Sequence, residues 1–460
     1  MEYISTRNIK ETFKFREVFL KGLAPDGGLF VPKSIPKYSF QDLEKLKSYS
    51  YNELATKIIS KFCHSEFNED EIHKIVNHSY ESFRVKDVVL INKLGGMNLL
   101  ELFHGPTLAF KDIAMQVIGN MYDRILEKHN LKINIVVATS GDTGAAAINA
   151  IKDKKNIKIF VLHPENKISE VQRKFMTTCD SKNVFNIAVS GNFDDCQKIV
   201  KSMFADKKFS NLINMSGVNS INWARIVVQT VYYFFSYFKI AKQNEKINFS
   251  VPTGNFGNIY SGYIAKKMGL PINKLIIATN KNDILKRVFT TGLYKPLNVM
   301  HTLSPSMDIQ VASNFERLIF DLCSCDSNKV LNYMKELDKK GEFHIDEKEL
   351  KNIREHFDSE SLPDEEIKLN ISEIYKNHKT LIDPHTSVGI GILKKLSLES
   401  NTIVLSTAHP SKFSEVVKGE TKEEPELPKK LKHILTKEEK YEKFPNDLKK
   451  IKNYILKKCS

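Results

Sequence analysis

The sequence of 460 residues predicts an α/β protein with mostly parallel sheets. From Asp87 onward, short runs rich in β-branched residues alternate with stretches that have the apolar period of a helix. The chain is long enough for two or three domains with a large core. A hydrophobic content of 41% with 27% charged residues is ordinary for a soluble globular protein.

The elements follow from this alternation. Residues up to about Val85 predict a helical N-terminal unit with amphipathic helices near 40–47 and 51–62, after a turn-rich segment at 22–32. The expected strands are 88–92, 98–103, 133–138, 158–162, 184–189, 246–251, 274–278 and 402–405. Asp112 is expected to cap a helix, and further helices are expected at 144–153, from 169, at 194–204, from 258 and at 283–289. Residues 326–378 predict a peripheral helical insertion, and the Lys/Glu-rich tail beyond Lys418 predicts a surface appendage.

Several classes of function are disfavoured by the composition. The net charge of +14 suggests nucleic acid, but the lysines are spread over helix faces without interleaved exposed aromatics, so no nucleic-acid partner is expected. The apolar stretch 226–238 is too short and too polar to span a bilayer and predicts a buried helix. The N-terminus carries no signal-peptide pattern, and the six cysteines have neither zinc nor redox spacing, so a cytoplasmic protein is expected. His104, His163 and His409 are not paired at metal-ligand spacing, so no metal site is expected.

A first motif, His-Gly-Pro-Thr-Leu-Ala-Phe-Lys-Asp at 104–112, places Lys111 at the start of a helix among apolar residues. Because burial disfavours an ammonium, it lowers the pKa of a lysine and frees the amine as a nucleophile. Such an amine forms a Schiff base with a carbonyl cofactor. A lysine before a helix is more often solvated, so this motif alone leaves both interpretations open.

A second motif, Pro-Thr-Gly-Asn-Phe-Gly-Asn at 252–258, follows a strand and opens a helix. Glycines let backbone N–H groups converge on an anion, and the helix N-terminus adds its positive end, so the motif predicts a phosphate-binding loop. It lacks the ending of a Walker loop. The alternative is a tight strand–helix turn.

A third motif, Ala-Thr-Ser-Gly-Asp-Thr-Gly-Ala at 138–145, also lies between a strand and a helix. Its small hydroxyl residues and exposed amides suit a carboxylate ligand. The same residues would also serve as a helix cap.

These motifs, in this order and with Leu-Ser-Thr-Ala-His-Pro at 405–410, resemble the threonine synthases, which are pyridoxal-phosphate enzymes. The resemblance covers residues 1 to about 415 and also rests on Tyr-Ile-Ser-Thr-Arg at 3–7, the segment 22–32, Asn-Ser-Ile-Asn-Trp-Ala-Arg at 219–225 and Ser-Pro-Ser-Met-Asp-Ile at 304–309. The pattern is that of the longer branch of the family, which carries an N-terminal domain.

The resemblance implies fold type II of the pyridoxal-phosphate enzymes, which is tryptophan-synthase-β-like. Two open, mostly parallel αβα domains would be joined to a helical N-terminal domain, residues 1–85. The catalytic region would be 86–415, with a large domain of about 86–125 and 245–415 and a smaller domain of about 126–244 inserted in it. Residues 416–460 would be a charged C-terminal appendage.

The resemblance also implies roles for residues. Lys111 would hold pyridoxal 5′-phosphate as a Schiff base and later move protons at the substrate carbons. Thr407 would face the pyridine nitrogen, where a neutral hydroxyl makes the ring a weaker electron sink than a carboxylate would. The cofactor phosphate would be held by Gly254, Asn255, Phe256, Gly257 and Asn258, and the substrate carboxylate by Ser140, Gly141, Asp142 and Thr143. Which side chain meets the cofactor's 3′-oxygen stays open.

The implied substrate is O-phospho-L-homoserine, and the implied products are L-threonine and phosphate. Arginine suits a phosphate because its fork bonds two oxygens, so Arg225 is the first candidate for the substrate phosphate. A surface or interhelical ion pair is the alternative for Arg225. Further candidates are Asn219, Ser220 and Asn222 as donors, then Lys174 and Arg173, then Ser304 and Ser306.

Two other functions agree with part of the sequence. A hydroxy-amino-acid dehydratase or phospho-lyase of the same fold would keep the cofactor, but a plain dehydratase would not need the second phosphate site at 219–225. A degenerate, non-catalytic binder of nucleic acid or protein would predict damage at Lys111, Gly254 or Gly257, and all three are intact. Trp223 and the aromatic residues at 232–235 are expected in the core. A monomer is preferred for this longer branch.

Overall fold

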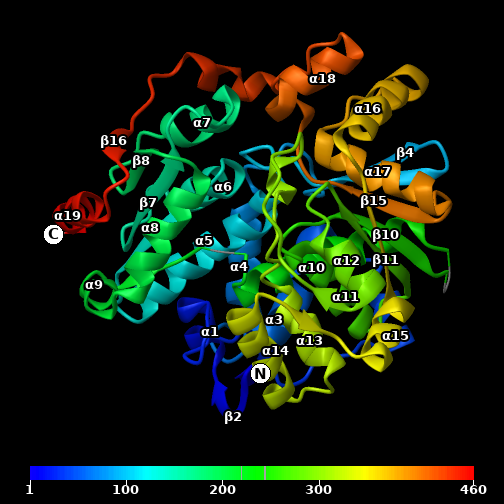
Figure 1. Cartoon of the computed structure of the whole chain (residues 1–460), viewed down its shortest axis with the longest axis horizontal. Coiled ribbons are helices and arrows are strands. Elements are labelled where there is room, and N and C mark those ends of the chain that lie inside the picture. The colour runs from blue at the N-terminus through cyan, green and yellow to red at the C-terminus, as the bar shows by residue number, and fades with distance from the viewer. Residues whose placement is uncertain (219, 243–244, 460) are drawn as a thin grey trace.

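The structure is a computed structural model that describes residues 1–218, 220–242 and 245–459. Two sheets of mostly parallel strands lie side by side, each flanked by helices (Figure 1). This arrangement confirms the predicted α/β fold. Within the described residues, no helix combines the length and apolar character needed to cross a bilayer.

The smaller sheet has the strand order β16-β8-β7-β6-β9, and all of its pairs are parallel. Its strands are β6 (Ile133–Ala138), β7 (Ile157–Pro164), β8 (Val184–Ser190), β9 (Met215–Ser216) and β16 (Glu442–Pro445). The helices around it are α6 (Asp142–Ile151), α7 (Glu170–Thr177), α8 (Phe193–Ala205), α9 (Lys207–Leu212) and α19 (Leu448–Cys459). Parallel strands need crossover connections, and the helices supply them.

The larger sheet has the order β14-β11-β10-β15-β5-β4, in which β4 alone of the described strands is antiparallel to its neighbour. Its strands are β4 (Leu90–Leu94), β5 (Met97–Glu101), β10 (Ile247–Pro252), β11 (Ile272–Thr279), β14 (Phe357–Ser361) and β15 (Thr402–Ser406). Around it lie α11 (Gly257–Lys267), α12 (Ile284–Thr291), η1 (Pro305–Met307), α13 (Phe315–Leu322), α14 (Ser327–Lys340), α15 (Glu347–His356), α16 (Asp364–His378), α17 (Pro384–Leu396), η2 (Pro410–Phe413) and α18 (Ser414–Thr421), with the small pair β12 (Leu293–Tyr294) and β13 (Phe343–His344).

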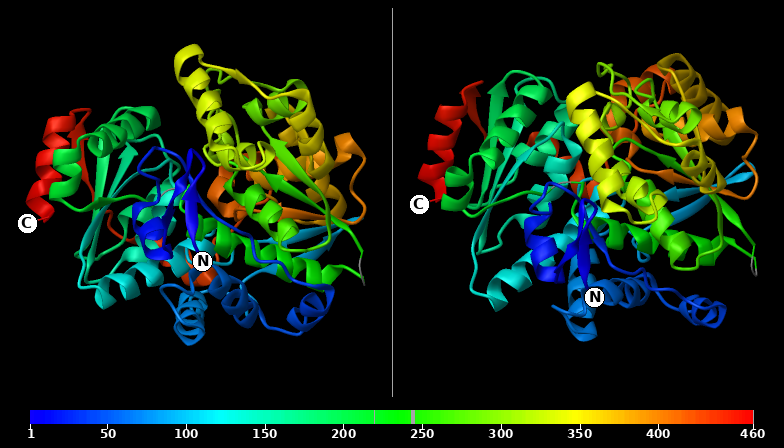
Figure 2. Two further views of the ribbon diagram at one scale, coloured as in Figure 1. Left: turned by 90° about the horizontal axis from the view of Figure 1, so that it is seen from below. Right: turned by 60° about the horizontal axis from the view of Figure 1, so that its bottom comes forward.

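The sequence predicts a helical N-terminal part. The structure has these helices and, in addition, a three-stranded antiparallel sheet. Its elements are β1 (Tyr3–Ser5), β2 (Asn8–Phe13), α1 (Phe15–Lys21), β3 (Phe30–Pro32), α2 (Phe40–Leu46), α3 (Tyr51–Cys63) and α4 (Glu69–Tyr80). These strands are short, and β2 is largely exposed, so they lack the apolar alternation that identifies a strand in a sequence. Figure 2 shows this part (blue) beneath the region where the two larger parts meet.

Two long helices, α5 (Lys111–Lys128) and α10 (Trp223–Ile240), form the centre of the molecule. The stretch predicted as a buried helix is α10, and Trp223 on it is fully buried. One hydrophobic cluster includes Trp223, Tyr3 of β1, Ile113 of α5 and Phe249 of β10, so the N-terminal part shares its core with the larger sheet. The predicted core role of Trp223 and of the aromatic residues at 232–235 is confirmed.

Three sequence-based expectations are wrong in part. The charged insertion at 326–378 is not wholly peripheral, because it supplies β14 to the edge of the larger sheet. The tail beyond Lys418 is more than an appendage, because it passes through η3 (Lys429–Thr436) over α7 and then adds β16 and α19 to the smaller sheet (Figure 1). Asp112 does not cap α5, since the helix begins at Lys111 and the Asp112 carboxylate accepts hydrogen bonds from Thr107. The domain boundaries stay a prediction.

Candidate active site

Lys111 and Thr407 come together because two chain segments pair through their backbones. The Phe110 N–H donates to the Thr407 carbonyl at 2.9 Å, and the His409 N–H donates to the Leu108 carbonyl at 3.0 Å. These bonds join the segment before α5 to the segment after β15. The first residue of α5 therefore lies beside the carboxyl end of the larger sheet, where open α/β sheets bind their ligands.

The Lys111 amine faces the smaller sheet. Its Nζ lies 3.3 Å from Oδ2 of Asp142, the first residue of α6, and the lysine side chain is only 12% exposed. Burial lowers the pKa of Lys111, Asp142 opposes this effect, and the positive charges of Lys412 and Arg225 lower the pKa further. The chemistry expected of Lys111, a readily deprotonated amine, is consistent with this environment.

Asp142 joins the two larger parts of the molecule through one carboxylate. Its Oδ1 lies 2.5 Å from Nζ of Lys412 and accepts from Nε2 of Gln172 at 3.1 Å, while its Oδ2 accepts from Oγ of Ser306 at 3.3 Å. Burial raises the pKa of the Asp142 carboxyl, but Lys412 and Lys111 outweigh burial and hold the pKa well below its ordinary value. Asp142 is therefore an anion in this site.

The loop that precedes α6 is held by Thr139, whose Oγ1 accepts from the N–H groups of Gly141 and Gly144 at 3.0 and 2.9 Å. Ser140 is exposed, and Thr143 is partly exposed. Thr139 thus accepts hydrogen bonds from two N–H groups at the start of α6. The Ser140 and Thr143 side chains stay accessible near Asp142.

The glycine loop, residues 252–258, lies against the segment 304–307. A Cβ on Gly254 would lie 3.1 Å from the Ser306 carbonyl oxygen and 3.3 Å from Cα of Met307, so only glycine lets the two backbones approach this closely. The carbonyl of Asn255 accepts from Nδ2 of Asn314 at 3.0 Å. Phe256 takes the left-handed conformation with φ of 64° and turns the chain into α11.

Asn258 in the first turn of α11 is held on one side and open on the other. Its Oδ1 accepts from the hydroxyls of Tyr232 and Tyr233 at 2.5 and 3.0 Å. Its Nδ2 is buried and has no hydrogen-bond partner among the described residues. A buried donor without a partner is costly, and a phosphate oxygen at the N-terminus of α11 would satisfy it. These features of the glycine loop fit the phosphate group of a cofactor.

Arg225 is a buried cation in the first turn of α10. The residue is 5% exposed, its Nε has no hydrogen-bond partner, and none of the ion pairs of the described residues involves it. Burial lowers the pKa of Arg225 to about 10, so it stays charged at neutral pH. An unpaired buried charge is costly unless a ligand neutralises it, so the ion-pair alternative loses support.

The other phosphate candidates have partners within the protein. Asn222 accepts from the Ala224 N–H and donates to the Phe19 carbonyl, both at 3.0 Å. Arg173 binds Glu439 and Lys174 donates to the Leu435 carbonyl, so both face the tail. The Ser220 carbonyl accepts from Asn314, and the Ser304 hydroxyl accepts from Asn280. Asn219 lies outside the described residues.

Two features of the site were missed in the sequence. Lys412 is buried at the site on η2, just beyond the motif that ends at Pro410. Behind Ser306, the Ser306 N–H donates to Nε2 of His385 at 3.3 Å, and Nδ1 of His385 lies 2.6 Å from Oδ2 of Asp383. The sequence Asp-Pro-His at 383–385 resembles a helix start and gives no sign of this contact.

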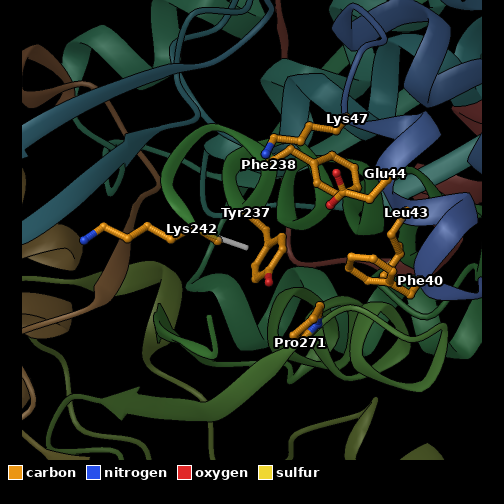
Figure 3. A pocket seen from close by; sticks show the side chains of 9 residues that line it. Phe40, Leu43, Glu44, Lys47, Tyr237, Phe238, Lys242 and Pro271 are labelled. Carbon is orange, nitrogen blue, oxygen red and sulfur yellow. The ribbon is translucent and has the colours of Figure 1, made fainter. Parts of the chain in front are cut away.

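A pocket elsewhere on the molecule is unrelated to these residues. Figure 3 shows it between α2 and the end of α10, lined by Phe40, Leu43, Tyr237, Phe238 and Pro271 together with the stems of charged side chains. It contains none of the candidate residues above.

Comparison with known proteins places the chain in a family. Three family models match it: "Threonine synthase N terminus" at residues 2–80, "Pyridoxal-phosphate dependent enzyme" at 99–341 and "Threonine synthase, C-terminal" at 386–455. The threonine synthase of Pseudomonas aeruginosa is 41% identical over 459 residues, which are 99% of this chain and 98% of that protein. The chain belongs to the threonine synthase family.

Other members of the threonine synthase family agree with this assignment. The threonine synthase of Saccharomyces cerevisiae is 40% identical over 98% of this chain and 97% of its own length. The crystal structure of PLP-bound threonine synthase from Brucella melitensis superposes with a TM-score of 0.97 at 41% identity, covering 100% of this chain and 99% of that one. The expected family, fold type and pyridoxal-phosphate dependence are thereby confirmed.

Proposed function

We propose that the protein is a threonine synthase, a lyase that converts O-phospho-L-homoserine and water to L-threonine and phosphate in threonine biosynthesis. The observation that carries this conclusion is similarity over the full length at about 41% identity to proteins of that name. The geometry agrees, because Lys111, the glycine loop and a second buried cation, Arg225, stand at one end of the larger sheet.

The residues that would hold pyridoxal 5′-phosphate are Lys111 at its carbonyl, Thr407 at the pyridine nitrogen, and Gly254, Asn255, Phe256, Gly257 and Asn258 at the phosphate. The Nδ2 of Asn258 and the start of α11 supply donors for that phosphate. When bound, the cofactor supplies an electron sink for charge that develops on the substrate carbons.

The chain's own residues would bind and orient the substrate and move its protons. Lys111, with its lowered pKa, would accept and return protons at the substrate carbons. The loop of Ser140, Gly141, Asp142 and Thr143 would receive the substrate carboxylate, with Ser140 and Thr143 as the accessible hydroxyls. The Asp142 side chain, an anion held by Lys412, would not itself contact that carboxylate. Arg225 would bind the phosphate that leaves from Cγ, and Asn219, Ser220 and Asn222 stay weaker candidates. Water would then add at Cβ.

A dehydratase or phospho-lyase of the same fold is the second candidate. Arg225 favours a phosphorylated substrate over the plain hydroxy-amino acid of a dehydratase, because no carboxylate of the described residues neutralises it. It does not separate a threonine synthase from a phospho-lyase, which would release phosphate without making threonine.

The test is to supply purified protein and pyridoxal phosphate with O-phospho-L-homoserine, and with L-serine and L-threonine in parallel. Equal release of phosphate and threonine is the expected result. A keto acid from serine or threonine without threonine formation would contradict it, as would phosphate release alone.

The role of Lys111 is tested by Lys111→Ala. The variant should fold, lose the absorbance of lysine-bound cofactor and lose turnover, because the Lys111 amine would form the bond to the cofactor's carbonyl. Activity retained in this variant would refute the assignment. A monomer is expected in the cytoplasm, and light scattering of the purified protein would check the oligomeric state.

A further inference from the structure

Lys412 is a fully buried lysine that none of the steps above uses. Its side chain is 0% exposed, its Nζ lies 2.5 Å from Oδ1 of Asp142, and it donates to the Thr107 carbonyl at 2.9 Å. The ring of Phe175 on α7 lies 5.6 Å from Nζ. Burying an ammonium is costly unless partners compensate it. Lys412 has such partners on three different segments, which indicates that its buried position has a role.

Asp142 consequently serves two lysines, one on each carboxylate oxygen. Oδ1 receives Lys412 at 2.5 Å, and Oδ2 receives Lys111 at 3.3 Å. The shorter contact shows that Lys412 is the main partner of the carboxylate. Gln172 donates a further hydrogen bond to Oδ1, and Ser306 donates one to Oδ2. The carboxylate therefore cannot rotate without losing hydrogen bonds.

The charge balance of this cluster explains why two lysines are needed. A buried carboxylate facing Lys111 alone would stabilise its ammonium form and hold the proton that the reaction must move. With Lys412 present, the negative charge of Asp142 is already compensated, and a second positive charge lies near Lys111. The Asp142 carboxylate can then stay directed at the Lys111 amine without holding that amine in its ammonium form.

We propose that Lys412 is a positioning residue for proton transfer by Lys111, acting through Asp142. Its ammonium holds Oδ1, so that Oδ2 stays directed at the Lys111 amine while that amine remains free to give up its proton. The proposal rests on the proposed function, since it concerns the same reaction. Lys412 itself does not touch the reacting atoms.

The placement of Lys412 supports this role. Thr107, which accepts from Lys412, lies four residues before Lys111, and Lys412 lies five residues after Thr407. The two segments are also paired through the backbone bonds between 108–110 and 407–409. Lys412 is therefore fixed to the same frame as Lys111, whereas Asp142 belongs to the smaller sheet, so the contact also aligns the two sheets at the site.

The experiment compares the holoenzyme with Lys412→Met, Lys412→Arg and Asp142→Asn. The first readout, without substrate, is the pH at which the absorbance of lysine-bound pyridoxal phosphate changes, since this reports protonation of the Lys111 nitrogen. The second is the pH profile of kcat with O-phospho-L-homoserine.

Opposite shifts are expected. Lys412→Met should raise the absorbance midpoint and the acidic limb of the kcat profile by about 1 pH unit, because Asp142 then stabilises the protonated nitrogen alone. Asp142→Asn should lower the midpoint, because Lys412 remains without its partner. Lys412→Met should lower kcat at neutral pH about 10-fold to 100-fold with KM changed less than about 3-fold, and Lys412→Arg should restore much of kcat.

The matched control is Lys154→Met. Lys154 is 12% exposed, donates to Asn120 at 2.8 Å and lies just beyond the C-terminal end of α6, whereas Asp142 begins that helix. This variant should leave midpoint and kcat unchanged even if thermal stability falls.

The outcomes separate this proposal from the proposed function. Wild-type enzyme that makes no threonine contradicts the function. Active wild type with unshifted midpoints and pH profiles in Lys412→Met contradicts the role of Lys412, whatever its stability. If Lys412→Met does not fold, Lys412→Gln and Asp142→Asn must still shift the midpoint in opposite directions, and shifts in the same direction would overturn the proposal.

Discussion

Among the candidate ligand-binding residues, Arg225 is the one that the structure supports most strongly. It is a buried guanidinium whose Nε has no hydrogen-bond partner in the described part of the chain. We predict that Arg225→Ala raises KM for O-phospho-L-homoserine and lowers kcat/KM about 100-fold or more, because losing a charged contact to a leaving phosphate typically costs that much in rate. Affinity for pyridoxal phosphate should change only a few-fold. Steady-state kinetics and cofactor titration measure the two effects.

The matched control for this prediction is Arg173→Ala, since Arg173 was also a phosphate candidate but binds Glu439 of the tail. Its KM should stay near that of the wild type. An unchanged KM in Arg225→Ala would place the phosphate elsewhere.

Asp112 provides a pH-dependent prediction. Its carboxyl is fully buried, and burial raises its pKa to about 6, although hydrogen bonds from Thr107 oppose the increase. In the unfolded chain the pKa is near its ordinary value of 3.8. The folded state therefore binds more protons between these values, and the stability contributed by protonated Asp112 is present below about pH 4 and lost as pH rises through about 6.

Asp112→Asn cannot ionise, so it removes this dependence. Relative to the variant, the wild type should lose about 2 kcal/mol of unfolding free energy between pH 4 and pH 7. Urea unfolding of both proteins at the two pH values measures this difference. A difference that stays constant with pH would show that Asp112 titrates normally in the folded protein.

Single residues differ in how well the sequence reveals them. Lys111 and the glycines of 252–258 stand in local motifs whose chemistry is readable from spacing alone. The orientation of Asn258 depends on its contact with Tyr232, 26 positions earlier in the chain. The role of Lys412 depends on its contact with Asp142, 270 positions earlier. No local sequence pattern predicts such contacts. From the sequence alone, Lys412 would be expected on the surface, as most lysines are.

At the scale of elements, α5 and α6 carry Lys111 and Asp142 at their first positions, so the packing of these helices sets the distance between the two side chains. Gly119 of α5 makes the packing close, because a Cβ there would lie 2.4 Å from the Ala150 carbonyl oxygen of α6. We predict that Gly119→Ala destabilises the protein by about 1–3 kcal/mol or more and lowers kcat. Thermal unfolding and steady-state kinetics measure both.

Gly419→Ala is the control for this substitution, because Gly419 also lies in a helix, α18, and a Cβ there would meet nothing within 4 Å. Its stability should stay within about 0.5 kcal/mol of wild type. If Gly119→Ala behaved like Gly419→Ala, the close contact between α5 and α6 would not be important.

The elements themselves were largely predictable where they are long and buried. The strands β6, β7, β8, β10, β11 and β15 lie within a few residues of their expected ranges because most of their residues are apolar and buried. The N-terminal strands and β14 were missed, since β14 has the sequence Phe-Asp-Ser-Glu-Ser and is mostly polar. An edge strand is set by its neighbour, here β11, rather than by its own residues.

At the scale of the whole molecule, the C-terminal tail completes the smaller sheet. Ile451 and Ile455 of α19 are fully buried in one cluster with Phe160 of β7 and Ile187 of β8. Two apolar residues four positions apart among lysines form one helix face, which the charge of the tail conceals in the sequence.

We predict that Ile455→Ala lowers the free energy of unfolding by about 2–5 kcal/mol, the usual cost of such a cavity. Leu435→Ala is the control, since Leu435 is 39% exposed, and its effect should be within about 0.5 kcal/mol. Urea unfolding measures both variants. Equal stabilities would show that α19 contributes little to the smaller sheet.

The order of strands has a consequence for synthesis on the ribosome. The strand β15, which lies between β10 and β5 in the larger sheet, spans Thr402–Ser406, and the edge strand β16 of the smaller sheet spans Glu442–Pro445. A nascent chain therefore cannot complete the larger sheet before residue 406 has been translated, or the smaller sheet before residue 445. Until then, the unpaired strands are open to association with other chains, so folding of this protein is expected to depend on protection of the nascent chain.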